Sequence, residues 1–526
     1  MTFAPDLIVH NANLVTLDPA RPQARALSVT GERIAAVGED EAILASAGPR
    51  TATLDARGLT LLPGFNDNHL HALGMGYFFQ HPNLFGKSAD EIVALLKQHY
   101  ATLKPGGRVT GYAWDYSSCP HPSKELLDRA FPENPVVLRQ YSGHAVWVNS
   151  LALRQMMADT APENIVRDAR GEPTGIVHST VVHRNHRRDI LRRALSPTLH
   201  WRLLDTALDR FRQAGITSVQ DNTWQPFTVW LLAALRKLGR LTARFSCWSF
   251  GHFPLLARSM DLGPYDPLWV RRGPEKHIVD GAFSPHTAWL LSPYENEPGN
   301  VGQAILPLQQ IERIVRRAVR RRRQLAFHAI GDRAVREVLN AVEQVAREDP
   351  AVSQLRIRLE HAQIIDPADL ARMRRLGVLA AVQPTALALP ERDRSLVGDS
   401  RFARLYPYRS LLDAGVPVSF GSDIPGEIEY DPFQVIHRAV SRHGIAATGG
   451  RYAPAQAVTV HEAVVAYCRG SAYAEFMEGQ KGALIPGMLA DFIALSQDIF
   501  ATDVERLPET KVLLTVVGGK IVHSRL

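Results

Sequence analysis

The stretch Gly64-Phe65-Asn66-Asp67-Asn68-His69-Leu70-His71 decides the fold, and an apolar run at 59–62 precedes it. That run has the composition of a short β-strand. His69 and His71 are two residues apart, so on extended backbone both imidazoles point to the same side, as two ligands of one metal ion must. This spacing alone is weak evidence, because an isolated pair of this kind is more often structural.

The histidine motif opens a series in which strands alternate with helices. Helical patterns lie between most of the strands, and one of them has Asp366 as its N-cap before Pro367. Eight such strands predict an α/β fold whose parallel sheet closes into a (β/α)8 TIM-like barrel. The apolar, β-rich runs are 59–62, 216–219, 245–250, 277–279, 325–327, 357–359, 378–382 and 416–420, and the helical patterns include 203–214, 311–323, 334–347 and 367–375.

The remaining parts of the chain are additions to this barrel. Short apolar runs at both ends, with hairpin signals at Gly31-Glu32 and Gly518-Gly519, predict that residues 1–60 and 480–526 pair into one small composite β-sandwich domain. Residues 61–479 then form the barrel. The interval between the first two barrel strands is too long for one crossover, so we expect an inserted subdomain at about 72–200.

Composition and charge exclude several classes of protein. The 526 residues are 45% hydrophobic and 21% charged, which is typical of a globular protein. Neither an apolar run of 18 residues nor a signal peptide is visible, so we expect a cytoplasmic protein without a membrane partner. The net charge of +7 is spread thinly and does not indicate a nucleic-acid partner, and the arginines within 316–323 are interpreted as a solvated helix end. The three cysteines are too far apart for a disulfide framework or a CxxC zinc site.

Polar side chains recur where the predicted strands end. His328 follows the fifth strand, His361 the sixth and Asp423 the eighth. Each alone has a structural explanation, such as a hydrogen-bonded histidine or an Asx turn at Asp423. Four histidines and an aspartate at this end of one barrel would be an improbable accident, because active sites of such barrels lie at that face.

These residue types are suited to metal-assisted hydrolysis. Neutral imidazoles suit Zn²⁺ and similar ions, and a carboxylate serves both as ligand and as proton acceptor. A metal ion lowers the pKa of its bound water toward 7, which yields hydroxide at neutral pH. Asp423 would take the proton from that water and pass it to the leaving group.

Lys276 is conspicuous because lysine is scarce. Only nine of the 60 basic residues are lysines, and Lys276 is the only one between Lys237 and Lys481. It precedes the predicted fourth strand, so its side chain can begin within the barrel. Its neutral amine can combine with CO₂ to give a carbamate able to bridge two metals. The alternative is a surface lysine at the strand entrance, and the preference for arginine elsewhere, which codon composition would also explain, argues only modestly against it.

Taken together, the motifs resemble the amidohydrolase superfamily, and specifically its amidohydrolase-3 branch, which includes N-substituted formamide deformylases. The resemblance covers essentially the whole chain. The motifs that carry it are Leu62-Pro63-Gly64-Phe65 before His69-x-His71, Gly111-Tyr112-Ala113-Trp114-Asp115, the segment 143–150, Lys276 before Asp280-Gly281, the segment 328–334, Glu360-His361-Ala362-Gln363, Gly421-Ser422-Asp423-x-Pro425, and Gly482, Pro486-Gly487 and Ala490-Asp491.

The resemblance implies a metal-dependent hydrolase that cleaves an amide or N-substituted formamide C–N bond by attack of metal-bound hydroxide. Asp423 would be both a ligand and the general base and acid, and Lys276 a carboxylated bridge in a binuclear centre. One or two divalent ions, most commonly zinc, are implied. The ligands would be His69, His71, Lys276, His328, His361 and Asp423.

From the resemblance we expect the substrate to be a small amide-type molecule. The oligomeric state is a separate question, for which a homodimer is one possibility. Trp114 and His144, in the insertion, either line the substrate pocket or are buried in the insertion's own core. One segment departs from the family pattern. Where relatives tend to carry a Gly-Ser-Arg-Thr-like stretch, this chain reads Phe283-Ser284-Pro285-His286-Thr287, which leaves the substrate open.

Other functions remain as alternatives. The same metal site serves cyclic-imide and lactone hydrolases and metal-dependent decarboxylases. A non-catalytic metal- or ligand-binding protein is a remote alternative, and loss of Asp423 would have been its sign, but Asp423 is present.

Overall fold

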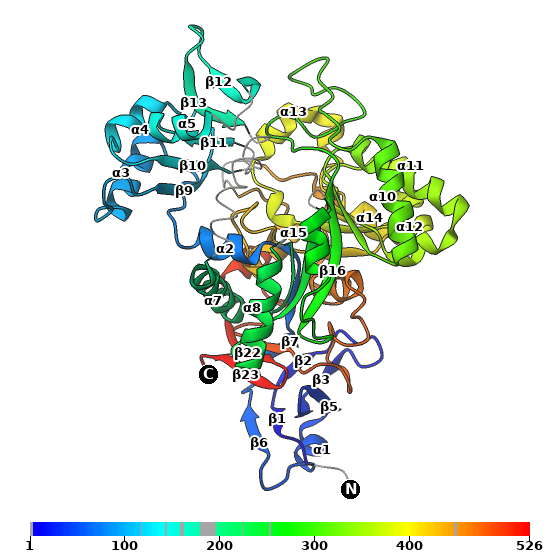
Figure 1. Cartoon of the computed structure of the whole chain (residues 1–526). Helices are drawn as coiled ribbons and strands as arrows, with labels where there is room; N and C mark the ends of the chain where they lie inside the picture. Colours follow the sequence, from blue (N-terminus) through cyan, green and yellow to red (C-terminus); the bar gives the residue numbers. More distant parts are fainter. Residues whose placement is uncertain are drawn as a thin grey trace. The chain divides into compact units, whose positions relative to one another are not determined.

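In the computed structural model, eight parallel strands form the nearly closed barrel predicted from the sequence. Figure 1 shows the course of the chain. The structure describes residues 4–116, 118–141, 145–157, 162–178, 196–222, 225–251, 254–445 and 450–526. In order around the sheet, the barrel strands are β8 (Phe65–Leu70), β14 (Ile216–Asp221), β15 (Arg244–Phe250), β16 (Val270–Ile278), β17 (Leu325–Ala329), β18 (Arg358–His361), β19 (Leu379–Val382) and β20 (Val418–Phe420).

Hydrogen bonds join the first and last strands of this sheet. The backbone N–H of Asp423 donates to the carbonyl of His69 at 2.7 Å, and the Asn68 side chain donates to the Ser419 hydroxyl at 2.7 Å. The buried Asp67 carboxylate accepts from the backbone N–H of Ser422 at 3.1 Å. These bonds hold the segment after β20 beside β8.

Helices follow most of the barrel strands. The Asp366 cap is confirmed, because its side chain accepts from the backbone N–H of Ala368 at 2.9 Å at the start of α12. The helix α7 (Pro197–Ala214) belongs to the second compact unit up to Ala207 and to the barrel unit from Leu208. The other long helices of the barrel unit are α8 (Pro226–Lys237), α10 (Leu308–Arg321), α11 (Asp332–Glu348), α12 (Pro367–Leu376), α13 (Pro390–Phe402) and α15 (Pro432–Ser441); shorter ones are α9 (Pro254–Met260), α14 (Tyr408–Asp413), α16 (Val460–Val465) and α17 (Ser471–Ala474).

Two strand predictions were wrong in position. The apolar run predicted as the first barrel strand forms β7 (Thr60–Pro63), which pairs with β21 (Phe492–Leu495) outside the barrel, and the first barrel strand is the histidine motif itself. The fourth strand, β16, begins at Val270 rather than at 277. Lys276 therefore lies inside this strand, near its carboxyl end, and not at its entrance.

Strands from the two ends of the chain lie side by side (Figure 1, blue and red). A six-stranded sheet has the order β23-β22-β21-β7-β2-β3, in which β22 (Val512–Val517) and β23 (Lys520–Ser524) form the predicted Gly518-Gly519 hairpin. A four-stranded sheet has the order β5-β4-β1-β6, and its β4 (Ala26–Thr30) and β5 (Arg33–Gly38) form the Gly31-Glu32 hairpin. The two sheets share one apolar core. The remaining strands are β1 (Leu7–His10), β2 (Asn13–Val15), β3 (Gln23–Ala24) and β6 (Ala52–Asp55).

A buried ion pair connects the barrel to the six-stranded sheet. Arg244, at the start of β15, donates to both oxygens of Asp491, with Nε–Oδ2 at 2.6 Å and Nη2–Oδ1 at 3.0 Å. Both side chains are less than 5% exposed. Asp491 Oδ1 also accepts from the backbone N–H of Gly518 at 2.7 Å, so this carboxylate holds the terminal hairpin as well.

We expect Asp491→Asn to lower the free energy of unfolding by about 3 kcal/mol, because the change leaves the Arg244 guanidinium buried without its bidentate counter-charge. Urea unfolding followed by circular dichroism measures the shift in midpoint. Glu509→Gln, in the exposed Arg506–Glu509 pair, is the matched control and should leave the midpoint in place. Equal midpoints for both variants would show that the buried pair contributes no more than an exposed one.

The insertion forms a second compact unit, Ala72–Ala207 with Ile424–Ile428. Its five-stranded sheet has the order β12 (Ile165–Arg167), β13 (Pro173–His178), β11 (Ala145–Val148), β10 (Val136–Gln140) and β9 (Val109–Trp114). Helices α3 (Ala89–His99), α4 (Lys124–Ala130) and α5 (Ser150–Met157) belong to this unit, which has its own apolar core. Across the described residues, the structure contains no helix long and apolar enough to span a membrane.

Candidate metal centre

Three of the predicted ligands meet where β8 and β20 end. His69 lies in β8, His71 follows it, and Asp423 follows β20; one ligand atom from each lies within 4.8 Å of the other two. Asp423 Oδ1 is 3.5 Å from His69 Nε2 and 3.3 Å from His71 Nε2. Two ligands at about 2.05 Å from a tetrahedral ion are about 3.3 Å apart, so this spacing fits one shared metal ion.

Hydrogen bonds fix which ring nitrogen of each histidine faces the centre. His71 Nδ1 contacts the carbonyl of Asn222 at 3.0 Å, and a carbonyl only accepts, so Nδ1 carries the proton and Nε2 presents its lone pair. His69 Nδ1 contacts Glu360 Oε2 at 2.6 Å and donates to that carboxylate in the same way. Both rings are therefore oriented as metal-ligating imidazoles usually are.

The charges at this point suit a cation. Burial, reinforced by the Lys276 charge, lowers the pKa of His69 well below its ordinary value, so this ring is neutral at pH 7. Asp423 Oδ1 is buried and has no hydrogen-bond partner among the described residues. A carboxylate oxygen that faces two nitrogen lone pairs is repelled by them unless a positive ion lies between. The residues present therefore fit a divalent metal.

The other predicted ligands surround this group without belonging to it. His361 Nδ1 lies 3.9 Å from Asp423 Oδ2, and its ring centroid is 5.2 Å from that of His69. The His328 ring is 4.5 Å from that of His361, and its Nε2 donates to the Gly281 carbonyl at 2.9 Å, which leaves Nδ1 with its lone pair. The structure thus brings all four histidines to one end of the barrel, with two of them in the tight group.

Lys276 is buried in the barrel wall beside the same group. Its Nζ lies 5.7 Å from the centroid of the Trp248 ring. Burial lowers the pKa of Lys276 to about 8, although the nearby Glu360 and Asp423 carboxylates act in the opposite direction. At neutral pH an appreciable fraction of this amine is therefore uncharged, which is the form that reacts with CO₂.

Backbone conformation at the site is unusual. His361, Ala362 and Asp423 adopt left-handed conformations, with φ values of 73°, 42° and 57°. Non-glycine residues in this region cost about 1–3 kcal/mol each and persist where the surrounding structure enforces them, most often at functional sites. Two of the three are predicted ligands, so the strain coincides with the orientation of their side chains.

A family model covers nearly the whole of this arrangement. Residues 52–523 match the model described as the amidohydrolase family. The chain belongs to the amidohydrolase family. As an amidohydrolase it is an enzyme that hydrolyses C–N bonds other than peptide bonds.

Individual relatives are similar over their full length. The chain is 30% identical to the putative amidohydrolase YtcJ of Bacillus subtilis (strain 168), over 91% of each chain. It is also 30% identical to the N-substituted formamide deformylase of Arthrobacter pascens, over 100% of this chain and 99% of the relative. A crystal structure of an uncharacterized metal-dependent hydrolase from Pyrococcus horikoshii OT3 has the same fold, with a TM-score of 0.78, 23% identity, and coverage of 95% and 99%.

Two buried residues of this amidohydrolase were missed as site residues by the sequence prediction. Glu360 accepts from His69 and also from Arg358, whose Nε lies 2.7 Å from Glu360 Oε1. Arg358 donates further to the Gln220 side chain and to the Asn68 carbonyl, and both charged side chains are fully buried. Arg358 and Glu360 alternate along β18, and two charged residues two apart in a buried strand are the signal that could have identified them.

We expect Glu360→Gln to weaken metal binding by about 10–100-fold, the usual cost of losing a hydrogen-bond partner behind a ligating histidine. The amide keeps an acceptor for His69 but removes the charge that orients the ring and balances Arg358. Competition with a chromophoric chelator measures the affinity. Glu478→Gln, in the exposed pair with Arg356, is the matched control, and an equal affinity in both variants would show that Glu360 does not position His69.

Trp114 and His144 were considered as residues that line the substrate pocket, and the structure describes only the first of them. Trp114 is fully buried in the apolar core of the insertion, where its indole N–H donates to the Leu138 carbonyl at 3.0 Å, which favours the second of its two predicted roles. His144 lies outside the described residues. The divergent segment 283–287 folds back on the site, since the Thr287 carbonyl accepts from the N–H of Gly281, whose own carbonyl holds His328.

Proposed function

We propose that this amidohydrolase cleaves the C–N bond of an N-substituted amide or formamide at a divalent metal centre held by His69, His71 and Asp423. One observation carries the proposal: the unpartnered Asp423 Oδ1 lies 3.3–3.5 Å from two ring nitrogens that present lone pairs. Ligands at this spacing with neutral imidazoles and one carboxylate favour Zn²⁺.

His328, His361 and Lys276 are proposed to complete a second position beside the first. The His328 and His361 rings meet edge to face, with their centroids 4.5 Å apart, and His361 Nδ1 lies 3.9 Å from Asp423 Oδ2. A carbamate on Lys276 would add two oxygens on a side chain that starts inside β16 and is shielded from water. This arrangement supports a binuclear centre with carboxylated Lys276 as the bridge.

Asp423 is the proposed acid–base residue. A divalent ion, when bound, polarises the substrate carbonyl and lowers the pKa of water toward neutrality. Asp423 would receive the proton of the attacking water on Oδ2, the oxygen not turned toward His69 and His71, and deliver it to the departing nitrogen. The same group must act first as base and then as acid, because water attacks readily only once it has lost a proton and an amine leaves readily only after protonation. His71, about a third exposed, lies on the open side of the group, so the substrate approaches past it.

The substrate class rests on the relative that acts on N-substituted formamides and matches this chain over its full length. The test is a screen of the metal-loaded protein on N-substituted formamides, other N-substituted amides, cyclic imides and lactones, with products identified by mass spectrometry. We expect equal amounts of amine and carboxylic acid, formate in the case of formamides. Turnover confined to lactones or cyclic imides, or release of CO₂ from a carboxylate substrate, would contradict the proposal and support one of the alternatives.

A further inference from the structure

A cavity of about 870 Å³ lies on the helix side of the barrel wall, away from the metal centre. Strands β15 and β16 form its floor, and α9 and the end of α10 form its sides. Glu275 and Lys276 are neighbours on β16 and point to opposite faces, since Glu275 pairs with Arg317 of α10 while Lys276 lies beside the metal centre. The cavity and the proposed active site are therefore on opposite sides of one strand.

The lining of this cavity is strongly basic. Three of its arginines are neutralised by ion pairs, Arg317 with Glu275, Arg272 with Asp261, and Arg271 with Glu475. Asp261, Glu275 and Glu475 are the only acidic residues among the described residues that line the cavity. Four further arginines line the cavity without a carboxylate partner among the described residues: Arg258, Arg321, Arg322 and Arg323.

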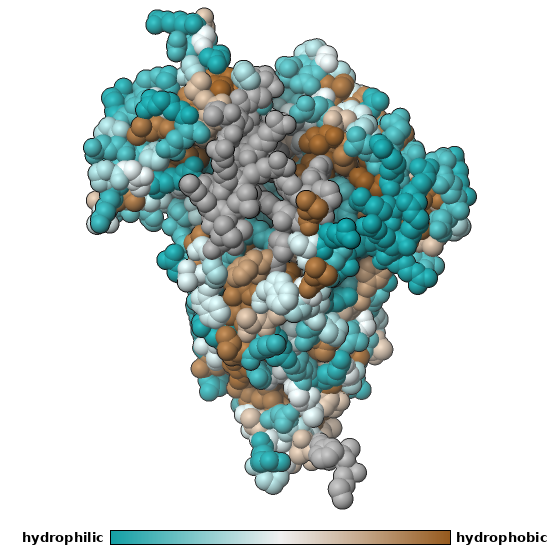
Figure 2. Space-filling model, viewed as in Figure 1, coloured by the Kyte–Doolittle hydropathy of each residue, from teal (hydrophilic) through white to brown (hydrophobic). Residues whose placement is uncertain are grey.

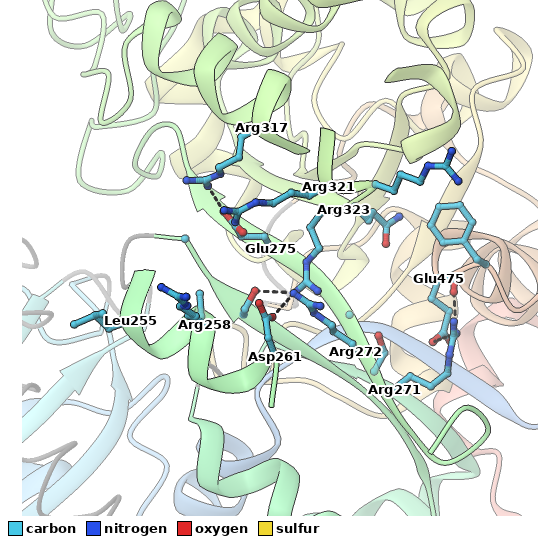
Figure 3. A pocket seen from close by; sticks show the side chains of 18 residues that line it. Leu255, Arg258, Asp261, Arg271, Arg272, Glu275, Arg317, Arg321, Arg323 and Glu475 are labelled. Carbon is cyan, nitrogen blue, oxygen red and sulfur yellow. Dashed lines mark hydrogen bonds and ion pairs between the residues drawn. The ribbon is translucent and has the colours of Figure 1, made fainter. Parts of the chain in front are cut away.

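Arg323 shows that an acceptor is missing. Its Nη2 donates to the Ser249 hydroxyl at 2.9 Å, but its Nε is buried and has no hydrogen-bond partner among the described residues. Buried guanidinium N–H groups are nearly always paired, because an unpaired one costs the full desolvation penalty. In Figure 3, Arg321 and Arg323 reach the cavity from above, and Arg258 and Arg272 from below.

A solvated helix end does not account for all of these arginines. Cations are favourable at the carboxyl end of α10, and Figure 2 shows a broad hydrophilic surface over α10, α11 and α12. This explains Arg320, which is exposed and does not line the cavity. It does not explain the buried Nε of Arg323, nor why Arg258 on a different helix lines the same space.

We propose that this cavity binds a small phosphate-bearing anion. Guanidinium groups pair with phosphate oxygens through two parallel hydrogen bonds, and the lining arginines that have no carboxylate partner among the described residues would supply such pairs. The volume is sufficient for a phosphate with an organic substituent. The ring of Phe476, 44% exposed, lines the same cavity and offers an apolar face to such a substituent.

Isothermal titration calorimetry of the full-length, metal-loaded protein with pyrophosphate tests this proposal. We expect binding that weakens at least tenfold in the double variant Arg321→Gln/Arg323→Gln and less than twofold in Arg320→Gln, the matched control on the same helix. Pyrophosphate also chelates metal ions, so its affinity is compared only among variants that contain the same amount of bound metal. Arg321→Gln alone serves if the double variant does not fold, since Arg321 is exposed.

A second titration uses citrate in place of pyrophosphate, because carboxylate groups also form paired hydrogen bonds with guanidinium groups. Weaker binding of citrate than of pyrophosphate would support a phosphate site. Tighter binding of citrate, no detectable pyrophosphate binding at millimolar concentration, or equal weakening by Arg320→Gln would overturn the proposal. Turnover is not part of the readout, so this result is independent of the proposed function.

Discussion

Replacing Asp423 with asparagine is expected to lower the turnover number by about 10²–10⁴-fold, the range that a positioned general acid–base contributes. The amide keeps an oxygen within reach of His69 and His71, so most of the bound metal should remain. It cannot accept a proton at neutral pH, so the step that transfers a proton to the leaving nitrogen is lost. Steady-state kinetics on the best substrate, with metal content determined in the same preparation, measure the effect.

Asp399→Asn is the control for this substitution, because Asp399 is 81% exposed and pairs only with surface Arg394 among the residues described. It should leave turnover unchanged. If Asp423→Asn retained full activity with normal metal content, the proposed proton transfer would be wrong and Asp423 would be a ligand only.

Replacing Lys276 with alanine should remove the ion of the second position and weaken the binding of the first, and with them abolish nearly all of the activity. The carbamate is proposed to supply two of the anionic oxygens of the centre, and the histidines alone provide no charge to compensate a second divalent ion. The shortened side chain leaves space within the barrel, so a short carboxylic acid such as acetate or propionate should enter and restore part of both metal content and turnover.

Lys237→Ala is the matched control, since Lys237 is exposed at the end of α8. Metal content is measured by atomic emission after exhaustive dialysis, with and without added acid. A Lys276→Ala protein that keeps its full complement of metal would rule out the bridging role.

The barrel was predictable because most of its strands are apolar and are separated by amphipathic helices. The first barrel strand was predicted too early in the chain, because β8 is polar in sequence although every residue in it is buried. Its polar side chains find partners inside the molecule, such as Glu475 for Asn66 and Tyr467 for Asp67. Hydrophobic periodicity cannot recognise a strand whose burial is balanced by hydrogen bonds with residues hundreds of positions away.

The start of β16 was predicted too late in the chain for a different reason. Gly273-Pro274 within it resembles a turn signal. Pro274 is tolerated because pairing with β17 begins only at Glu275, opposite Leu325, so the missing N–H leaves no partner unsatisfied on that side. The arrangement of neighbouring strands, which the sequence does not state, therefore decides where this strand begins.

The candidate site was predictable to the extent that its side chains follow strands directly. His69, His71 and Asp423 come from the two strands at the seam, and barrel topology brings such ends together. The residues that orient these ligands through hydrogen bonds were not predictable in the same way. Glu360 and Arg358 act through partners on β8 and β14, and only the folded barrel shows that these charges are paired and buried.

Titration of metal-free protein with Zn²⁺, with bound metal and turnover recorded in the same samples, tests the proposed metal centre in the wild type and in His71→Ala. We expect turnover to be absent without metal and to rise in step with occupancy in the wild type, and we expect His71→Ala to bind the metal far more weakly. Turnover in the metal-free protein, or unchanged zinc affinity in His71→Ala, would contradict the proposed metal centre.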